Sequence, residues 1–248
     1  MSSELEGRVA IVTGAGRNIG RSIALALAEA GAAIVVNGHA NRAAVDAVVS
    51  QIESRGGKAV AAMADVSDES AVERMTNLAV ERLGRIDILV NNAAVRPEKQ
   101  FESLSLSDWR AVHSVILEGA FLTVKAALPH LKASGSGAIV NIGGMSAHTG
   151  AKHRAHVIAA KSGLLGFTKA LAHDLAEHGI TANCVVPGLI DTVRAPGTTP
   201  QHHLSTKTLT DRFGAPDDIA AAVRFLAGPD ARYITGQAFH INGGAYLG

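Results

Sequence analysis

The sequence predicts a single α/β domain in which a doubly wound parallel sheet of about seven strands carries helices on both faces. Short, continuous apolar stretches alternate with helix-like stretches along the whole chain, which is typical of strands buried on both faces. The 248 residues suit one α/β domain, and an apolar content of 47% is enough for a sizeable core. Because no linker, repeat or low-complexity tract interrupts the chain, we expect one domain over residues 1–248.

Each strand is expected where apolar residues run together between turn-forming residues. The expected strands are Arg8–Thr13, Ala33–Asn37, Lys58–Ala64, Asp87–Asn91, Ala138–Ile142, Thr181–Val186 and Gln237–Ile241. Each helix is expected where apolar residues recur at helical spacing. The expected helices are Ile19–Ala30, Arg42–Arg55, Val72–Leu83, Ser107–Leu128, Ala155–Glu177 and Pro216–Leu226. The fourth of these helices should stop near Pro129, because proline lacks the backbone donor that continues a helix.

One long irregular stretch, Gly188–Ala215, holds Pro196, Pro200 and two adjacent histidines. A connection of this length within a compact domain is often a functional lid. We therefore expect a substrate lid over residues 188–215.

Composition and charge argue against several classes of partner and location. The formal net charge is +1 and no long basic run occurs, which disfavours nucleic acid and anionic membrane as partners. No apolar run reaches the roughly 18–20 residues of a membrane span, and no signal peptide is visible. The single cysteine, Cys184, cannot form an internal disulfide, so we expect a cytoplasmic protein.

A glycine-rich loop joins the first strand to the first helix and reads Thr13-Gly14-Ala15-Gly16-Arg17-Asn18-Ile19-Gly20. Glycines let the backbone turn tightly and approach a pyrophosphate, and the helix N-terminus offers free N–H groups to it. The position of this loop, at the start of a βα repeat, predicts a dinucleotide-binding Rossmann fold. An ordinary βα turn is the alternative interpretation.

Taken in order, the motifs resemble those of the short-chain dehydrogenase/reductase family, in particular its 3-oxoacyl-carrier-protein reductases. The family loop reads Thr-Gly-x-x-x-Gly-x-Gly, so Asn18 stands where the middle glycine belongs. Asparagine tolerates a positive φ better than most residues, so we expect the turn to survive. The further matches reach residue 244; they are Asp65-Val66, Asn91-Asn92-Ala93-Ala94, Pro187-Gly188, Thr192, Gly236 and Asn242-Gly243-Gly244.

The resemblance implies which residues bind the dinucleotide. They come from the phosphate loop, from the ends of the following strands, and from the segment that cradles the nicotinamide and its carboxamide. They are Gly14, Arg17, Asn18, Ile19, Gly20, His39, Asp65, Val66, Asn92, Ala93, Ala94, Lys161, Pro187, Gly188, Ile190 and Thr192.

The end of the second strand indicates which dinucleotide is bound. Enzymes that prefer NAD usually place an acidic residue there, to hold the ribose 2′-hydroxyl. Here the strand ends Asn37-Gly38-His39, without a carboxylate. Arg17 lies where NADP-using relatives often carry a basic residue, and Arg42 and His39 are further cations nearby. We therefore expect NADP rather than NAD; the alternative is that Arg17 and Arg42 are simply solvated cations.

The family uses an asparagine, a serine, a tyrosine and a lysine for catalysis. The resemblance implies that the tyrosine protonates the substrate carbonyl, the lysine holds the nicotinamide ribose, the serine binds the substrate oxygen and the asparagine holds a water. Lys161 and the residues after it match the family closely, but the other positions read Ile116, Gly144 and Val157.

Asn141-Ile142-Gly143-Gly144 supports this register, because the family commonly reads Asn-Ile-Ser-Ser there. The chain has 2 tyrosines, Tyr233 and Tyr246, and no Tyr-x-x-x-Lys. Only the lysine of the catalytic set is therefore retained.

Other proton donors lie near the vacant positions, and we take His156 as the leading catalytic candidate and Ser146 as the second, beside Lys161. His156 points about 100° round the helix from position 157. The alternative is that His148, His153 and His156 are satisfied polar groups. No cysteine or carboxylate lies among them, so we expect no metal site.

We therefore predict an NADP(H)-dependent oxidoreductase that acts on an unknown small substrate without the usual tyrosine acid. The alternative is a catalytically silent dinucleotide-binding protein, either a sensor or a partner subunit. Arg96 and Lys99 lie near the expected substrate mouth, which favours an anionic or polar substrate. Family members are commonly tetramers, so the resemblance implies a homo-oligomer, a tetramer or a dimer.

Overall fold

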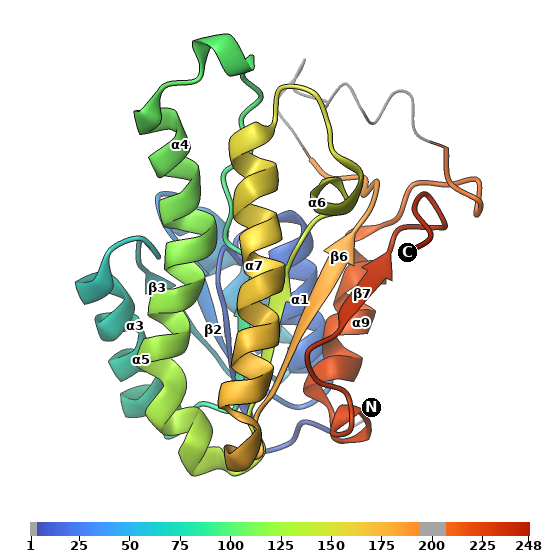
Figure 1. The fold of residues 1–248 in the computed structure, drawn as a ribbon. Coiled ribbons are helices and arrows are strands. Elements are labelled where there is room, and N and C mark those ends of the chain that lie inside the picture. Colours follow the sequence, from blue (N-terminus) through green and yellow to red (C-terminus); the bar gives the residue numbers. More distant parts are fainter. Residues whose placement is uncertain (1–3, 194–206) are drawn as a thin grey trace.

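A parallel sheet of seven strands forms the centre of the computed structural model, which describes residues 4–193 and 207–248 (Figure 1). The strand order is β3-β2-β1-β4-β5-β6-β7, and every neighbouring pair is parallel. The strands are β1 Val9–Val12, β2 Ala33–Gly38, β3 Ala59–Met63, β4 Ile88–Asn91, β5 Ala138–Ile142, β6 Thr181–Pro187 and β7 Ala238–Ile241. The order reverses between β1 and β4, and ligands of such sheets bind at the strands' carboxyl ends beside this reversal.

Helices cover both faces of the sheet. One face carries α1 Asn18–Glu29, α2 Arg42–Ser54 and α9 Pro216–Ala227. The other face, turned toward the viewer in Figure 1, carries α3 Glu69–Leu83, α5 Gly119–Ser134 and α7 Ala155–Asp174, with α4 Leu106–His113 above α5. A short helix, α6 Ser146–Thr149, lies between β5 and α7. The predicted doubly wound fold is therefore confirmed.

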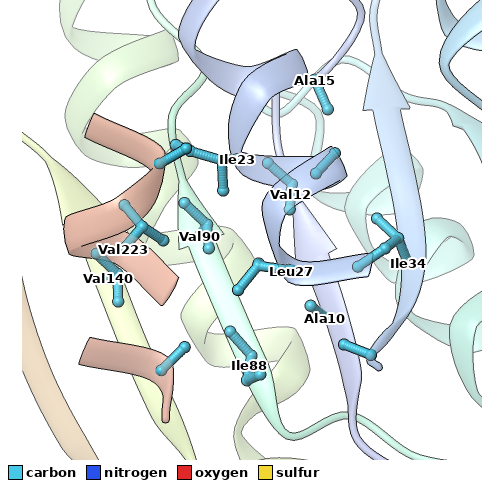
Figure 2. Close-up of a cluster of buried hydrophobic side chains, with 14 of the residues drawn as sticks. Ala10, Val12, Ala15, Ile23, Leu27, Ile34, Ile88, Val90, Val140 and Val223 are labelled. Atoms are coloured by element: carbon cyan, nitrogen blue, oxygen red, sulfur yellow. The ribbon is translucent and has the colours of Figure 1, made fainter. Parts of the chain in front are cut away.

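The core is divided into two layers because successive strand residues point to opposite faces. In β1, Val12 packs toward α1 and α9, whereas the adjacent Ile11 packs toward α3 and α5. Figure 2 shows the first layer, in which Ile23 and Leu27 of α1 and Val223 of α9 meet the sheet. Strands buried on both faces explain why the sequence reads as continuous apolar runs.

The long helix in the middle of the chain differs from the prediction in two ways. The prediction that it ends near Pro129 is wrong, since α5 continues to Ser134 with Pro129 inside it. Both Pro129 and Lys125 are exposed, so the carbonyl that loses its partner at the proline faces water. In addition, a π-helical turn over Ser114–Glu118 joins α4 to α5, and nothing in the apolar spacing signals such a turn.

Among the described residues, one helical segment, Leu106–Ser134, is long and apolar enough to cross a membrane by length and composition alone. Its most apolar window has a mean hydropathy of 1.4. By this measure, a stretch of membrane-spanning length exists, although no apolar run of that length is expected from the sequence. In the fold this segment packs against α3 and α7, which accounts for its apolar residues.

Candidate functional site

The phosphate loop after β1 is shaped by side chains from two neighbouring strand ends. The Asn37 side chain accepts a hydrogen bond from the Gly14 N–H (3.1 Å) and donates to the carbonyls of Ala62 and Ala64 (both 3.1 Å). The Asn92 amide donates to the carbonyls of Thr13 (2.8 Å) and Gly14 (3.1 Å). Sequence reasoning missed this role of Asn37, although a buried asparagine at a strand end is a signal for it.

Two positions in this loop have a restricted choice of residue for steric reasons. A Cβ on Gly20 would lie 2.3 Å from the Gly14 carbonyl oxygen and 2.5 Å from the Asn92 amide nitrogen, so only glycine fits there. Asn18 has a φ of 50°, which confirms that asparagine adopts the left-handed turn expected of it. The loop therefore keeps the backbone shape that brings the start of α1 to the carboxyl end of the sheet.

An open cleft of about 550 Å³ lies at the start of α1. The residues that line it are Gly16, Arg17, Asn18, Arg21, Ser22, Asp191, Val193 and Pro216. The first turn of α1 directs unpaired N–H groups and the positive end of the helix dipole toward such a space, and the exposed Arg17 adds a cation. The cleft therefore suits a phosphate group. Its lining also includes Asp191, whose negative charge opposes this preference.

Two predicted residues meet beyond this cleft, at the ends of β2 and β3. His39 Nε2 lies 3.6 Å from a carboxylate oxygen of Asp65. The other oxygen of Asp65 accepts hydrogen bonds from the N–H and the hydroxyl of Ser67. These two bonds, the first more than the second, hold the pKa of Asp65 below its usual value. Arg42 is already paired with Asp46 at 2.8 Å, which leaves Arg17 as the better placed cation for a further phosphate.

Lys161 lies buried on α7, and its ammonium group donates a hydrogen bond to the carbonyl of Ile142 at the end of β5. Burial lowers the pKa of Lys161 to about 7; the nearby charge of Arg96 acts in the same direction, and Cys184 acts against it. Lys161 therefore exchanges its proton near neutral pH.

The positions where the family has its asparagine and tyrosine lie in one apolar cluster between the central helices. This α4–α7 cluster consists of Val112, Ile116, Ala120, Val157, Ala160 and Leu164. Ile116 and Val157 are each only 2% exposed. Val157 also precedes Lys161 by one helical turn, so both project from the same side of α7. Apolar side chains therefore occupy the position at which the family carries its tyrosine acid.

Gly143 and Gly144 follow β5 and have different surroundings. A Cβ on Gly144, the position of the family serine, would meet nothing within 4 Å. A Cβ on Gly143 would lie 2.8 Å from the Cys184 sulfur. Burial raises the pKa of that thiol to about 11, against the opposing effects of Lys161 and the Gly143 N–H, so Cys184 stays protonated at neutral pH.

His156 and Lys161 share no hydrogen bond in the structure. His156 is fully buried, and neither ring nitrogen has a hydrogen-bond partner. Burial lowers the pKa of His156, and the charged groups that act on it are Asp108, Arg154, His113 and Lys99. Since Asp108 and His113 belong to α4, the imidazole lies on the α4 side of α7.

The other candidates belong to the segment between β5 and α7. Ser146, partly exposed, is the first residue of α6. His148 packs against His240 and Tyr246, with ring centres 4.5 and 5.5 Å away. His153 has a φ of 61° before the start of α7, and its carbonyl accepts the Lys99 N–H at 2.8 Å. In the part of the chain that the structure describes, no group of three or more metal-ligating side chains gathers.

The segment after β6 carries the residues expected at the nicotinamide. The Gly188 N–H is bonded to the Ile241 carbonyl (3.0 Å), and a Cβ on Gly188 would meet Asn242 at 2.6 Å. Ile190 forms a parallel bridge with Gly214, and Thr192 follows, half-buried. The rest of the predicted lid includes residues 194–206, which lie outside the described residues.

Comparison with known proteins identifies the family. The model of the enoyl-(acyl carrier protein) reductase family matches residues 14–246. A 3-oxoacyl-[acyl-carrier-protein] reductase of Synechocystis sp. is 40% identical over 244 residues, which are 98% of this chain and 98% of that protein.

Solved structures agree with this match. A dehydrogenase/reductase from Sinorhizobium meliloti superposes with a TM-score of 0.93 at 38% identity, over 99% of this chain and 98% of that one. A short chain dehydrogenase from Burkholderia cenocepacia, solved in complex with NADP, superposes with a TM-score of 0.91 at 36% identity, over 98% of this chain and 99% of that one. The chain therefore belongs to the short-chain dehydrogenase/reductase family of oxidoreductases.

Proposed function

We propose that this protein is an NADP(H)-dependent oxidoreductase that acts on a small substrate without a tyrosine acid. The observation that carries the proposal combines two features. The phosphate cleft at the start of α1 suits a dinucleotide. At the family's catalytic positions, Ile116 and Val157 belong to one apolar cluster. The dinucleotide end of the site is equipped for binding, and the proton-donating end is altered.

The residues present fit the dinucleotide. Gly14 and Gly20 allow the close backbone approach that a pyrophosphate needs, and the start of α1 supplies N–H donors. Asp65 and Val66 suit the adenosine side, and Lys161 suits the nicotinamide ribose. Pro187, Gly188, Ile190 and Thr192 suit the nicotinamide, while Asn92, Ala93 and Ala94 form the wall at the end of β4. When bound, the dinucleotide would supply hydride-transfer chemistry.

NADP is favoured over NAD by charge. No carboxylate stands at the end of β2, where it would bind a ribose hydroxyl and repel a 2′-phosphate. The exposed Arg17 offers positive charge instead. The NADP complex of the Burkholderia cenocepacia relative supports the same choice.

The altered end of the site restricts the chemistry. Positions 116, 144 and 157 carry no side chain that donates a proton. A positioned general acid contributes roughly 10²–10⁴ to a rate, so ordinary ketones should be reduced poorly. In this respect we expect the chain to differ from its Synechocystis relative, which is named for the reduction of a 3-oxoacyl substrate. Iminium ions and activated alkenes need less proton assistance, and they are the substrate classes we favour.

If a side chain donates the proton, we propose His156 or Ser146. His156 is sealed on the α4 side of α7 and would need a distortion at the start of that helix to reach the substrate. Ser146 is already partly exposed. Turnover and pH profile of His156→Ala and Ser146→Ala test this assignment; unchanged rates in both variants would exclude it.

The apolar packing around Val157 also favours the second candidate, a dinucleotide-binding protein without turnover. Both candidates predict binding of NADPH, and they differ in whether a substrate is then turned over. Calorimetric titration with NADPH and NADH comes first, with tighter NADPH binding expected. A panel of ketones, iminium ions and activated alkenes is then tested with wild type and Lys161→Ala. Lys161-dependent turnover of any substrate supports the oxidoreductase, whereas binding without turnover supports the silent protein. Ketone turnover near 10 s⁻¹ would contradict the altered site.

A further inference from the structure

Asn18 links the start of α1 to the segment after β6 at the phosphate cleft. Its side-chain NH₂ donates to the Val193 carbonyl (3.1 Å), and its side-chain oxygen accepts the Val193 N–H (3.0 Å). Asn18 begins α1, whereas Val193 lies beyond β6, and both residues line the cleft. The pairing is complementary in both directions, so it also fixes the orientation of the amide.

The residue held by this contact is the neighbour of Thr192. On the N-terminal side of Thr192, the Asp191 N–H is bonded to the Gly214 carbonyl (2.8 Å), and the Gly214 N–H is bonded to the Leu189 carbonyl (2.9 Å). On its C-terminal side stands Val193, bonded to Asn18. Thr192 is thus fixed between two anchors, one at Gly214 shortly before α9 and one in the phosphate loop.

This arrangement depends on the residue type at position 18. The glycine of the family motif has no side chain to reach across, and other side chains are sterically disfavoured at a φ of 50°. Asparagine both tolerates this conformation and carries a donor and an acceptor side by side. The departure from the family loop therefore creates a contact that a glycine cannot make.

We infer that Asn18 is a positioning residue that links the start of α1 to the segment after β6 and holds Thr192 in place for the nicotinamide end of the dinucleotide. The inference rests on the proposed function, because it takes the cleft to be the NADP site. The contact is local to the cleft walls, and Asn18 does not itself touch the nicotinamide in this assignment.

The test compares a complete and a truncated ligand. Asn18→Gly removes the contact and keeps a residue suited to positive φ. Calorimetry measures its affinity for NADP⁺ and for 2′-phospho-ADP-ribose, which has the pyrophosphate but no nicotinamide. Loss of the two hydrogen bonds should weaken NADP⁺ binding about tenfold and 2′-phospho-ADP-ribose binding less than about twofold. Asn41→Gly, which removes the same side chain from the start of α2, is the matched control and should change neither affinity.

Equal weakening of both ligands, or no weakening of either, would overturn the inference. A second measurement needs no cofactor: hydrogen exchange at the Val193 amide, followed by NMR. Exchange should be about threefold to tenfold faster in Asn18→Gly than in wild type and in Asn41→Gly. Unchanged exchange would show that the contact does not hold Val193. If the wild type binds neither ligand, the proposed function fails, and the exchange experiment alone decides whether Asn18 holds this segment.

Discussion

The two ends of the proposed cofactor site are packed in opposite ways. At the phosphate end, the side chains of Asn37 and Asn92 bind the backbone of Thr13 and Gly14 by hydrogen bonds, and only glycine fits at position 20. At the catalytic end, Ile116 and Val157 lie in the α4–α7 cluster, and Gly144 contributes no side chain. The fold itself is the same at both ends.

The contrast teaches which parts of the site the fold needs. The polar groups at the phosphate end shape the backbone, so replacing them with apolar residues would leave buried donors and acceptors unpaired. The side chains at the catalytic positions affect the reaction and not the backbone conformation. Apolar side chains at these positions do not destabilise the core. We therefore expect binding and chemistry to be separable in this chain.

Restoring the catalytic side chains gives the strongest test of this separation. Gly144→Ser with Val157→Tyr should raise kcat/KM for a β-keto ester by about 10²-fold or more, because a serine and an acid return beside Lys161. Gly144→Ser has open space and should leave the unfolding free energy nearly unchanged, whereas Val157→Tyr overpacks the cluster and should lower it by about 1–3 kcal/mol. A folded double variant with no gain in rate would point to Ile116 as the remaining obstacle.

A substitution at the phosphate end should act on binding instead. Gly20→Ala forces a Cβ to within 2.3 Å of the Gly14 carbonyl, so the loop must shift. We expect NADPH affinity to fall about 100-fold and the unfolding free energy to fall by about 2–3 kcal/mol. Gly166→Ala on α7, where nothing lies within 4 Å, is the control and should leave affinity intact. Wild-type affinity in Gly20→Ala would refute the assigned loop geometry.

Lys161 links the two ends and predicts a pH dependence of stability. Its folded pKa of about 7 lies below the unfolded value near 10.5, so the unfolded chain binds more protons between these values. Stability should therefore rise with pH, by about 2 kcal/mol from pH 7 to pH 9. Urea unfolding of Lys161→Met should lack this contribution, while Lys169→Met, an exposed neighbour on α7, should retain it. The same slope in all three proteins would contradict a buried, deprotonating Lys161.

The smallest expected effect concerns cofactor choice. Arg17→Ala should weaken NADPH about tenfold and NADH little, because one exposed cation is lost from the 2′-phosphate. Arg42→Ala is the comparison, since Arg42 is already paired with Asp46, and it should matter less. Calorimetry with both cofactors decides; a larger loss in Arg42→Ala would place the 2′-phosphate on α2 instead of the phosphate loop.

Sequence patterns predicted the parts of the fold that depend on local periodicity. The seven strands and the main helices follow from apolar spacing, and the positive φ of Asn18 follows from its residue type. The continuation of α5 through Pro129 was not predictable, because it depends on an exposed helix face. The π-helical turn at Ser114–Glu118 and the short helix α6 likewise leave no periodic signal.

Sequence motifs named the candidate site residues, but they could not predict the contacts that these residues make. The family motif located Lys161 and the phosphate loop. It did not show that Asn18 reaches Val193, since these residues are distant in sequence and meet only through the fold. Helical spacing also did not reveal that His156 packs toward α4. The spacing gives the direction of a side chain around its own helix, but not which other element covers that side.

The close approach of Gly143 to Cys184 makes the two positions mutationally coupled. A serine at position 143, which the family often carries, would collide with the sulfur 2.8 Å from its Cβ. Cys184→Ala would first remove that sulfur, after which Gly143→Ser becomes sterically acceptable. The order of the two substitutions therefore decides whether the intermediate sequence must accommodate this close contact.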